Sequence, residues 1–173
     1  GTAGVALYIQ DLTRDNAPIK RIIEGYDYEY SVLGMHDGRF LVYTNDNAPR
    51  YRLISVDPRN SQRANWKEVI AEQPYVLSNI ELANGRILAA YDIDVMSHLF
   101  CYSMKGEKLY EVELPGQGSL QGISADKDTP EAFYTYTSFI MPRTVYRMDV
   151  EKNVSEKYYA PEIDFNSDDY ESY

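Results

Sequence analysis

The sequence predicts an all-β fold built from repeated four-stranded antiparallel sheets, and three observations support this prediction. Four short strand-like segments end at positions 11, 57, 103 and 149, so each lies 46 residues after the one before. The preceding strand keeps this spacing, because Leu41, Ile87 and Phe133 are also 46 residues apart. The 17 Tyr and 8 Pro favour strands and turns over helices. A period of roughly 40–50 residues made of short strands is typical of the blades of a β-propeller.

The clearest copy of the repeat is the hairpin at residues 131–150. Its first strand, 132–137, is aromatic and β-branched, and Pro142 favours a turn before the second strand at 144–150. The repeated closing strands are Leu7–Asp11, Leu53–Asp57, Leu99–Ser103 and Val145–Asp149. Ser103 departs from the Asp found at the other three ends. The alternative to a propeller is a β-sandwich in which the spacing is coincidental.

The remaining segments complete the prediction of strands in chain order. Alternating aromatic and acidic residues predict a strand at 26–30, and Asp37-Gly38 and Asn84-Gly85 predict tight hairpins. The segment Trp66–Glu72 is the best candidate for a helix and can equally form a strand. The other strands are expected at residues 5–12, 19–23, 40–45, 51–57, 75–82, 86–92, 98–104, 109–114, 119–124 and 156–160.

These strands group into about three and a half four-stranded antiparallel blades. Residues 1–24 give the outer strands of an incomplete blade, residues 25–72, 73–115 and 116–160 give one blade each, and residues 161–173 form an acidic linker. Roughly four to eight blades are needed to close a ring. We therefore expect a fragment of a propeller, with self-association in which each copy covers the open blade edges of the other.

The composition excludes several classes of partner. The 173 residues carry a net charge of −10 and a pI near 4.6, which argues against nucleic acid and against an anionic membrane as partners. No run of 18 apolar residues occurs, so we expect a soluble protein, and the cytoplasm and the periplasm both stay open because any signal peptide would lie outside this chain. Cys101 is the only cysteine, which excludes an intrachain disulfide and favours a buried thiol.

No catalytic, substrate-binding, cofactor-binding or metal-binding residue is predicted. A serine nucleophile on a strand-to-helix elbow needs G-x-S-x-G, and Ser119 follows Gly116-Gln117-Gly118 in the wrong place. His36 and His98 lie in different repeats without a metal-binding partner three or four residues away. Structural roles are therefore favoured for both histidines.

Several polar clusters are likewise interpreted as turn caps. Asp92 and Asp94 would share one strand face, and Asp46 occupies the comparable turn one repeat earlier. The repeated Asp at the strand ends is expected to accept hydrogen bonds from backbone amides of the next turn. Two further patterns are weak: Asp126-Lys127-Asp128 lacks the glycine of a calcium loop, and Asn153-Val154-Ser155 fits a glycosylation triplet.

Several segments together carry a resemblance to a known family. They are Asn45–Ile54 with Trp66–Ile70, the Glu113-Leu114-Pro115-Gly116 segment with Gly118-Ser119, and Phe133–Phe139 with Pro142 and Tyr146. In this order they resemble the later part of the propeller of prolyl oligopeptidases, the proline-specific serine peptidases. The resemblance implies a seven-bladed propeller that caps an α/β-hydrolase domain carrying Ser, Asp and His.

The resemblance also implies a function for the whole protein. The propeller would restrict cleavage to short proline-containing peptides, and residues 164–173 would lead toward the hydrolase domain missing here. The implied partners are that domain, the missing blades and short peptides as substrates of the parent, with no cofactor; no triad residue has a counterpart in this chain. The competing hypothesis is a stand-alone propeller that binds a protein or glycan, with Tyr26, Tyr28 and Tyr30 as a stacking surface.

Overall fold

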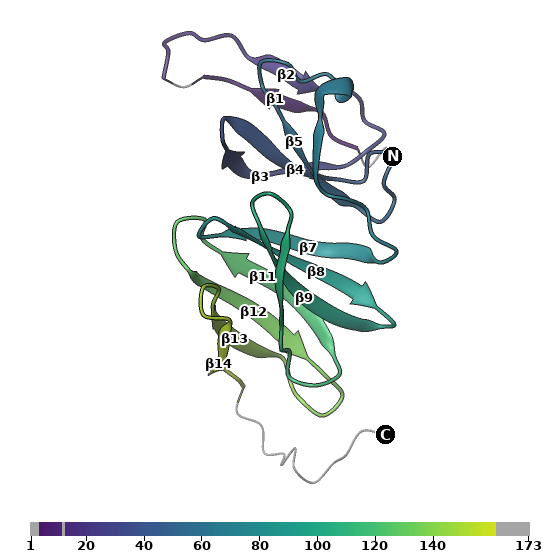
Figure 1. Ribbon diagram of the computed structural model, residues 1–173, viewed down its shortest axis with the longest axis vertical. Helices are drawn as coiled ribbons and strands as arrows, with labels where there is room; N and C mark the ends of the chain where they lie inside the picture. Colours follow the sequence, from purple (N-terminus) through teal and green to yellow (C-terminus); the bar gives the residue numbers. More distant parts are fainter. Residues whose placement is uncertain (1–3, 12, 162–173) are drawn as a thin grey trace. The chain divides into compact units, whose positions relative to one another are not determined.

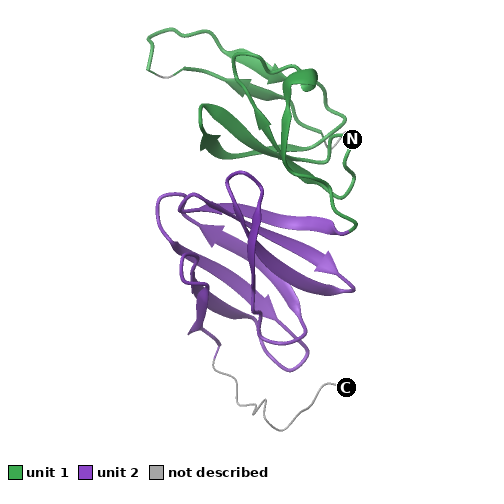
Figure 2. Cartoon of the chain, viewed as in Figure 1, with its two compact units in different colours: residues 1–74 green, residues 75–173 purple. Residues whose placement is uncertain are grey.

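The computed structural model describes residues 4–11 and 13–161, and it shows an all-β chain (Figure 1). The chain divides into two compact units, residues 1–74 and residues 75–173 (Figure 2). Within the described residues there are three four-stranded sheets and one two-stranded sheet, all antiparallel. The prediction of about three and a half antiparallel blades is therefore confirmed. The predicted acidic linker lies outside the described residues, apart from Pro161.

The first unit contains the two-stranded sheet and one four-stranded sheet. Its elements are β1 (Leu7–Ile9), β2 (Lys20–Ile23), β3 (Tyr30–His36), β4 (Arg39–Thr44), β5 (Arg52–Val56), the 3₁₀ helix η1 (Arg63–Asn65) and β6 (Lys67–Ile70). β1 pairs with β2, and the other four strands pair in chain order. One cluster of buried side chains in these sheets consists of Ile22, Ile23, Tyr30, Val42, Ile54 and Val56.

The second unit contains two four-stranded sheets. The strands are β7 (Val76–Ala83), β8 (Arg86–Ile93), β9 (Met96–Ser103), β10 (Lys108–Val112), β11 (Ser119–Ala125), β12 (Glu131–Thr137), β13 (Thr144–Asp149) and β14 (Val154–Tyr159). Each sheet pairs its strands in chain order. A shared core joins the two sheets, and it includes Leu88, Leu99, Cys101, Tyr134, Tyr136 and Met148. The prediction that Cys101 is buried is confirmed.

Polar contacts reinforce this packing at one end of the second unit. The side-chain amide of Asn84, in the β7–β8 turn, donates to Glu151 Oε1 at 2.6 Å, in the turn that follows β13. The hydroxyl of Tyr110 on β10 donates to the carbonyl oxygen of Val150. Since both contacts run from one sheet to the other, the two sheets are held together by polar contacts as well as by the core.

The structure corrects one predicted strand and shows which of two predicted elements forms at another segment. Residues 26–30 do not form the predicted strand: Tyr26–Tyr28 form a bend, and β3 begins only at Tyr30. The amide of Glu29 donates to Asn45 Oδ1 at 2.8 Å instead of joining a ladder, which separates the bend from the strand. The sequence of residues 66–72 allows a helix or a strand, and the structure shows the strand β6 at Lys67–Ile70.

The repeated residue at the strand ends caps the following turn, as predicted. The carboxylate of Asp11 accepts from the amide of Thr13 at 3.0 Å, that of Asp57 from Arg59 at 2.9 Å, and that of Asp149 from Glu151 at 3.0 Å. Ser103 does the same with its hydroxyl oxygen, which accepts from the amides of Lys105 and Glu107, both at 3.2 Å. The 46-residue period thus repeats one local device, and Ser103 departs from it in residue type only.

Tight turns join several neighbouring strands. Asp37-Gly38 and Asn84-Gly85 have positive φ at both positions, with values of 48° and 71°, and of 44° and 68°. This geometry is the one expected for two-residue hairpins, so the two predicted turns are confirmed. Asp94-Val95 forms a third such turn between β8 and β9, with φ of 48° and 62°. Val95 is therefore a β-branched residue in the left-handed region, where its side chain is sterically disfavoured.

Replacing Val95 by Asn should stabilise the chain by about 1 kcal/mol, because Asn tolerates the left-handed region better than a β-branched residue. The Val95 side chain is 96% exposed, so the change removes no packing. Urea unfolding of both chains measures the difference. Val154→Asn is the control, because Val154 is 57% exposed and has no positive φ. An equal gain in both variants would contradict the assignment of strain to Val95.

No helix in the described part of the chain is long and apolar enough to cross a membrane.

Candidate functional site

A buried carboxylate organises the polar interior of the first unit. Asp46 follows β4 and is fully buried; Arg63 of η1 forms an ion pair with its Oδ2 at 2.6 Å, and the hydroxyl of Tyr30 donates to the same oxygen at 2.5 Å. The guanidinium of Arg63 also lies 5.8 Å from the ring centre of Trp66. Burial, together with the hydrogen bond to Asp46, raises the pKa of Tyr30 to about 12, so its phenol stays a donor.

This cluster contradicts the proposed stacking surface at Tyr26, Tyr28 and Tyr30. Tyr30 is only 5% exposed because its hydroxyl reaches the buried Asp46. The guanidinium of Arg63 lies over the ring of Tyr28, 5.4 Å from the centre of that ring, whereas Tyr26 is 57% exposed. The three rings therefore do not share an open face. The cluster also holds no nucleophile beside a base, and its contacts join β3, the turn after β4 and η1.

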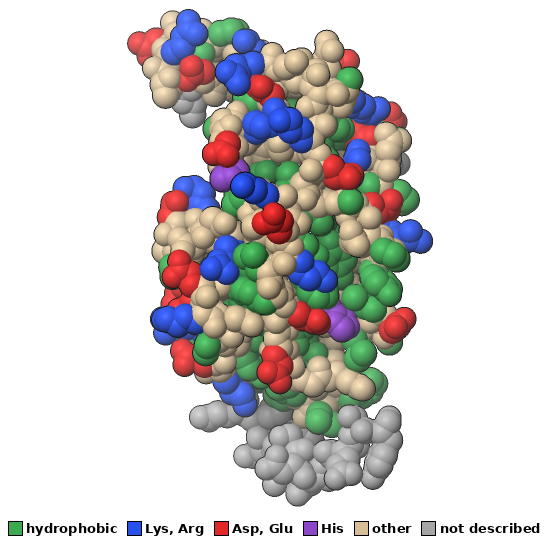
Figure 3. Space-filling model, in the orientation of Figure 1, with side chains coloured by type: hydrophobic (Ala, Val, Ile, Leu, Met, Phe, Trp, Pro, Cys, Tyr) green, Lys and Arg blue, Asp and Glu red, His purple; other side chains and the backbone are tan. Residues whose placement is uncertain are grey.

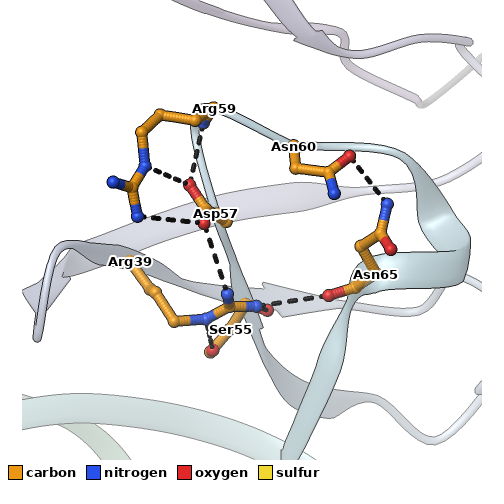
Figure 4. Close-up of polar contacts among 6 residues, drawn as sticks. All are labelled: Arg39, Ser55, Asp57, Arg59, Asn60 and Asn65. Atoms are coloured by element: carbon orange, nitrogen blue, oxygen red, sulfur yellow. Dashed lines mark hydrogen bonds and ion pairs between the residues drawn. The ribbon is translucent and has the colours of Figure 1, made fainter.

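A second polar network joins the β5 turn to the loop before β6 (Figure 4). Arg39 donates from Nε to Ser55 Oγ at 2.6 Å, and from one terminal nitrogen to the carbonyl oxygens of Ser55 and Asn65 at 2.9 and 3.3 Å. Asp57 accepts from the side chain of Arg59 at 3.2 Å, and these hydrogen bonds hold the pKa of Asp57 below its usual range. Because Arg39 bonds to oxygens of both Ser55 and Asn65, the network fixes the loop before β6 against β5.

Within residues 4–11 and 13–161, the histidines do not form a triad with a serine. His98 on β9 lies 2.8 Å from Glu111 Oε1 on β10 across the ladder, and His36 lies 3.4 Å from Asp37. Ser97 is buried; its hydroxyl donates to Asp92 Oδ1 at 3.2 Å and accepts from the amide of Leu120 at 2.9 Å. Successive residues of a strand point to opposite faces, so Ser97 and His98 cannot act as a pair.

The expectation that Asp92 and Asp94 share one strand face is wrong. Asp92 pairs with Ser97 in the ladder of β8 and β9, whereas Asp94 lies in the turn with φ of 48° and so shares no strand face with it. Asp126 accepts from the amide of Asp128 at 2.8 Å, so that segment caps its own turn. No group of three metal-ligating side chains occurs in the part of the chain that the structure describes. The glycosylation triplet at Asn153 stays a prediction.

The segment between β10 and β11 explains the two glycines of the Leu-Pro-Gly-x-Gly sequence. Gly116 has a φ of 77°, and its carbonyl oxygen accepts from the hydroxyl of Tyr136 at 2.8 Å. The carbonyl oxygen of Gly118 accepts from the amide of Ser97 at 3.1 Å. A Cβ on Gly118 would lie 2.3 Å from the carbonyl oxygen of Thr137, so only glycine fits there. This connection is fixed to both β9 and β12.

Beside this connection lies a groove of about 470 Å³. Met96, Val112 and Leu114 give it apolar walls, and His98, Glu111 and Glu113 add polar groups. In Figure 3, hydrophobic side chains gather beside the histidine in the lower half of the view. Sequence reasoning did not find this groove, because its residues come from two stretches, 96–98 and 111–117, and no pattern in either marks a groove.

One carboxyl in the second unit is perturbed by burial alone. Partial burial of Glu81 on β7 raises its pKa. A carboxyl whose pKa is raised on folding favours the fold below the unfolded pKa, and this contribution is lost as pH rises through the folded pKa.

We therefore expect Glu81→Gln to raise the melting temperature at pH 7 by up to about 3 °C, with the gain disappearing near pH 4. Glu107→Gln removes the same charge from an exposed turn and is the control. Thermal unfolding of both variants at the two pH values measures this. A gain for Glu81→Gln that is equal at pH 4 and pH 7 would contradict the role of its ionisation.

The sheet order, the 46-residue repeat and the sheet-on-sheet packing define a segment of a β-propeller. The chain belongs to the family of prolyl oligopeptidase N-terminal β-propeller domains, whose model matches residues 1–161. The family resemblance of the sequence is thereby confirmed, and the β-sandwich alternative is wrong.

The relatives agree with this assignment. Prolyl endopeptidases of Elizabethkingia miricola and Elizabethkingia meningoseptica are 29% and 30% identical to this chain over 171 residues, covering 99% of it. The chain spans 24% of the length of each relative. A solved structure from a study of two prolyl endopeptidases, on inter-domain dynamics in catalysis and specificity, matches with a TM-score of 0.87 and 28% identity over 96% of this chain and 24% of its own. Prolyl oligopeptidase B of Galerina marginata shares the fold, with a TM-score of 0.83 and 22% identity over 95% of this chain and 24% of its own.

Proposed function

We propose that this chain is a non-catalytic part of a seven-bladed propeller that caps the active site of a prolyl oligopeptidase-like serine peptidase. In the whole protein the propeller restricts cleavage to short proline-containing peptides, and an α/β-hydrolase domain outside this chain supplies Ser, Asp and His. The blades of this proposal are residues 25–72, 73–115 and 116–160. The match to the propeller domain of this family over residues 1–161 is the observation that carries the proposal.

The chemistry of the described residues supports a role without catalysis. A serine hydrolase needs a nucleophile within hydrogen-bond reach of a base, and an oxyanion site beside it. Ser97, a buried serine adjacent in sequence to a histidine, instead bonds to Asp92 and to the amide of Leu120. Its hydroxyl oxygen is thus occupied by a structural contact.

The packing of the second unit supports a role as a rigid barrier that limits access to the active site. Its two sheets share one core, and contacts at Gly118 and at Asn84 fix opposite ends of the sheets. A barrier of this kind excludes a folded protein and admits a flexible peptide only through an opening between parts of the enzyme. Such closure also keeps competing water away from the reacting groups.

The test compares two substrates of the whole protein. Wild-type enzyme should cleave a short proline-containing peptide and leave the same proline bond largely uncut within a long polypeptide. Gly118→Ala loosens the barrier and should raise the ratio of long-substrate to short-substrate cleavage, whereas Gly122→Ala should not. An unchanged ratio in a Gly118→Ala enzyme whose second unit is shown to be loosened would contradict the gating role.

The stand-alone binding module is not supported by the structure. Its stacking surface at Tyr26, Tyr28 and Tyr30 is not formed, since Tyr30 is buried.

A further inference from the structure

The tight turn between β7 and β8 carries a polar contact that joins the two sheets of the second unit. The side-chain amide of Asn84 donates to Glu151 Oε1 at 2.6 Å, in the turn that follows β13. The charged residues beside Glu151 are Asp149 and Lys152, which form an ion pair with each other at 2.9 Å. Lys152 therefore does not replace Asn84 as the donor to Glu151.

The same turn has the sequence and the geometry of a chemically labile site. Asn84-Gly85 is the one Asn-Gly pair among the 173 residues. The ladder of β7 and β8 closes at the pair of Ala83 and Arg86, so the amide nitrogen of Gly85 lies outside it. Apart from chain neighbours, nothing lies within 4 Å of a Cβ added to Gly85, and the residue is exposed. The space beside this nitrogen is therefore open to water.

This arrangement permits an intramolecular reaction of the Asn84 side chain. The backbone nitrogen of Gly85 loses its proton to water and attacks Asn84 Cγ, which glycine allows because it has no Cβ to obstruct the approach. The new N–Cγ bond closes a cyclic imide, and the Cγ–Nδ2 bond breaks to release ammonia, which takes a proton from water. A water molecule then opens the imide at either carbonyl carbon. The products are Asp and isoaspartate, and the net change is replacement of an amide by an acid.

We propose that Asn84 is a site of spontaneous deamidation whose conversion releases the polar contact between the two sheets of the second unit. A carboxylate at position 84 cannot donate to Glu151, and it places a like charge opposite that carboxylate. Isoaspartate also adds a carbon atom to the backbone, which a two-residue hairpin turn does not accommodate. The modification thus acts on the packing of two neighbouring sheets.

Ageing of the whole protein at a mildly alkaline pH, followed by peptide mass mapping, tests the site. Asn60 is the internal comparison, because it also lies in a turn and its Oδ1 accepts from the side chain of Asn65 at 2.8 Å, but a serine follows it. We expect Asn84 to convert at least about tenfold faster than Asn60, and Gly85→Asn to slow the conversion at position 84 by about tenfold. Asn at position 85 tolerates the positive φ and adds the obstructing Cβ. Equal rates at Asn84 and Asn60, or no slowing by Gly85→Asn, would overturn the site.

Hydrogen exchange of the whole protein at neutral pH tests the consequence. Asn84→Asp should raise amide exchange about fivefold in the turns at residues 83–86 and 149–153, because the contact between them is replaced by repulsion. The same change in a Glu151→Gln protein should leave exchange unaltered, since the Gln amide can donate to the new carboxylate. An increase of the same size in both backgrounds, or no increase in either, would contradict the role of the contact with Glu151.

Discussion

Replacing Gly118 by Ala is expected to destabilise the second unit by about 3 kcal/mol, because a methyl group must force backbone atoms apart. The added Cβ would lie 2.3 Å from the Thr137 carbonyl oxygen and 2.9 Å from a ring carbon of Tyr136. The closest atom belongs to the backbone of β12, so a rotamer change cannot relieve the clash. The shift would also strain the hydrogen bond between Gly118 and Ser97.

Gly122→Ala is the control for this prediction. Gly122 lies four residues further on, in β11, and nothing lies within 4 Å of the Cβ that Ala would add. We expect its effect on the free energy of unfolding to stay within about 0.5 kcal/mol. Urea unfolding followed by circular dichroism measures both variants. Similar losses for the two would show that the close approach at Gly118 has no special role.

Replacing Asp46 by Ala is expected to cost about 3 kcal/mol, near the lower end for breaking a buried ion pair, because Arg63 can turn toward water. The Arg63 side chain is 54% exposed, whereas that of Asp46 is fully buried. The loss also leaves the Tyr30 hydroxyl without its acceptor. Tyr30→Phe keeps the ion pair and removes one hydrogen bond, so it should cost about 1 kcal/mol.

Asp57→Ala is the control for the Asp46 prediction. Asp57 also lies where a strand leads into a turn, and it forms an ion pair with Arg59. Unlike Asp46, its side chain is 19% exposed. Surface pairs contribute little, so the expected cost is about 1 kcal/mol. If Asp46→Ala cost no more than Asp57→Ala in the same unfolding experiment, the burial of the Asp46 cluster would have no energetic consequence.

The repeat was predictable from sequence because it depends on local chemistry. Each blade repeats the same strand and the same cap, as at Asp57 and Asp149, so equal spacing in the sequence corresponds to equal positions in the sheets. The turns at Asp37-Gly38 and Asn84-Gly85 were predictable for the same reason, since positive φ favours these residue types. Both the alternation of residue types along a strand and the residue preferences of a turn depend only on residues that are close in sequence.

What the sequence did not reveal depends on contacts between distant segments. Tyr30 belongs to a regular alternation with Tyr26 and Tyr28. Its side chain is buried because its hydroxyl donates to the buried Asp46, sixteen residues later in the chain. Asp94 follows Asp92 at strand spacing, but the turn begins between them. The groove beside Gly118 combines segments from β9, β10 and the connection to β11, and no sequence pattern marks such a combination.

The central claim is that this chain is a propeller segment of a serine peptidase and carries no reactive serine of its own. Treating the whole protein with a fluorophosphonate during turnover of a proline-containing peptide, and then mapping the adduct by mass spectrometry, tests this claim directly. The account predicts loss of activity with one labelled serine outside residues 1–173, and no turnover by residues 1–173 alone. A labelled serine within residues 1–173, with activity lost in proportion, would contradict it.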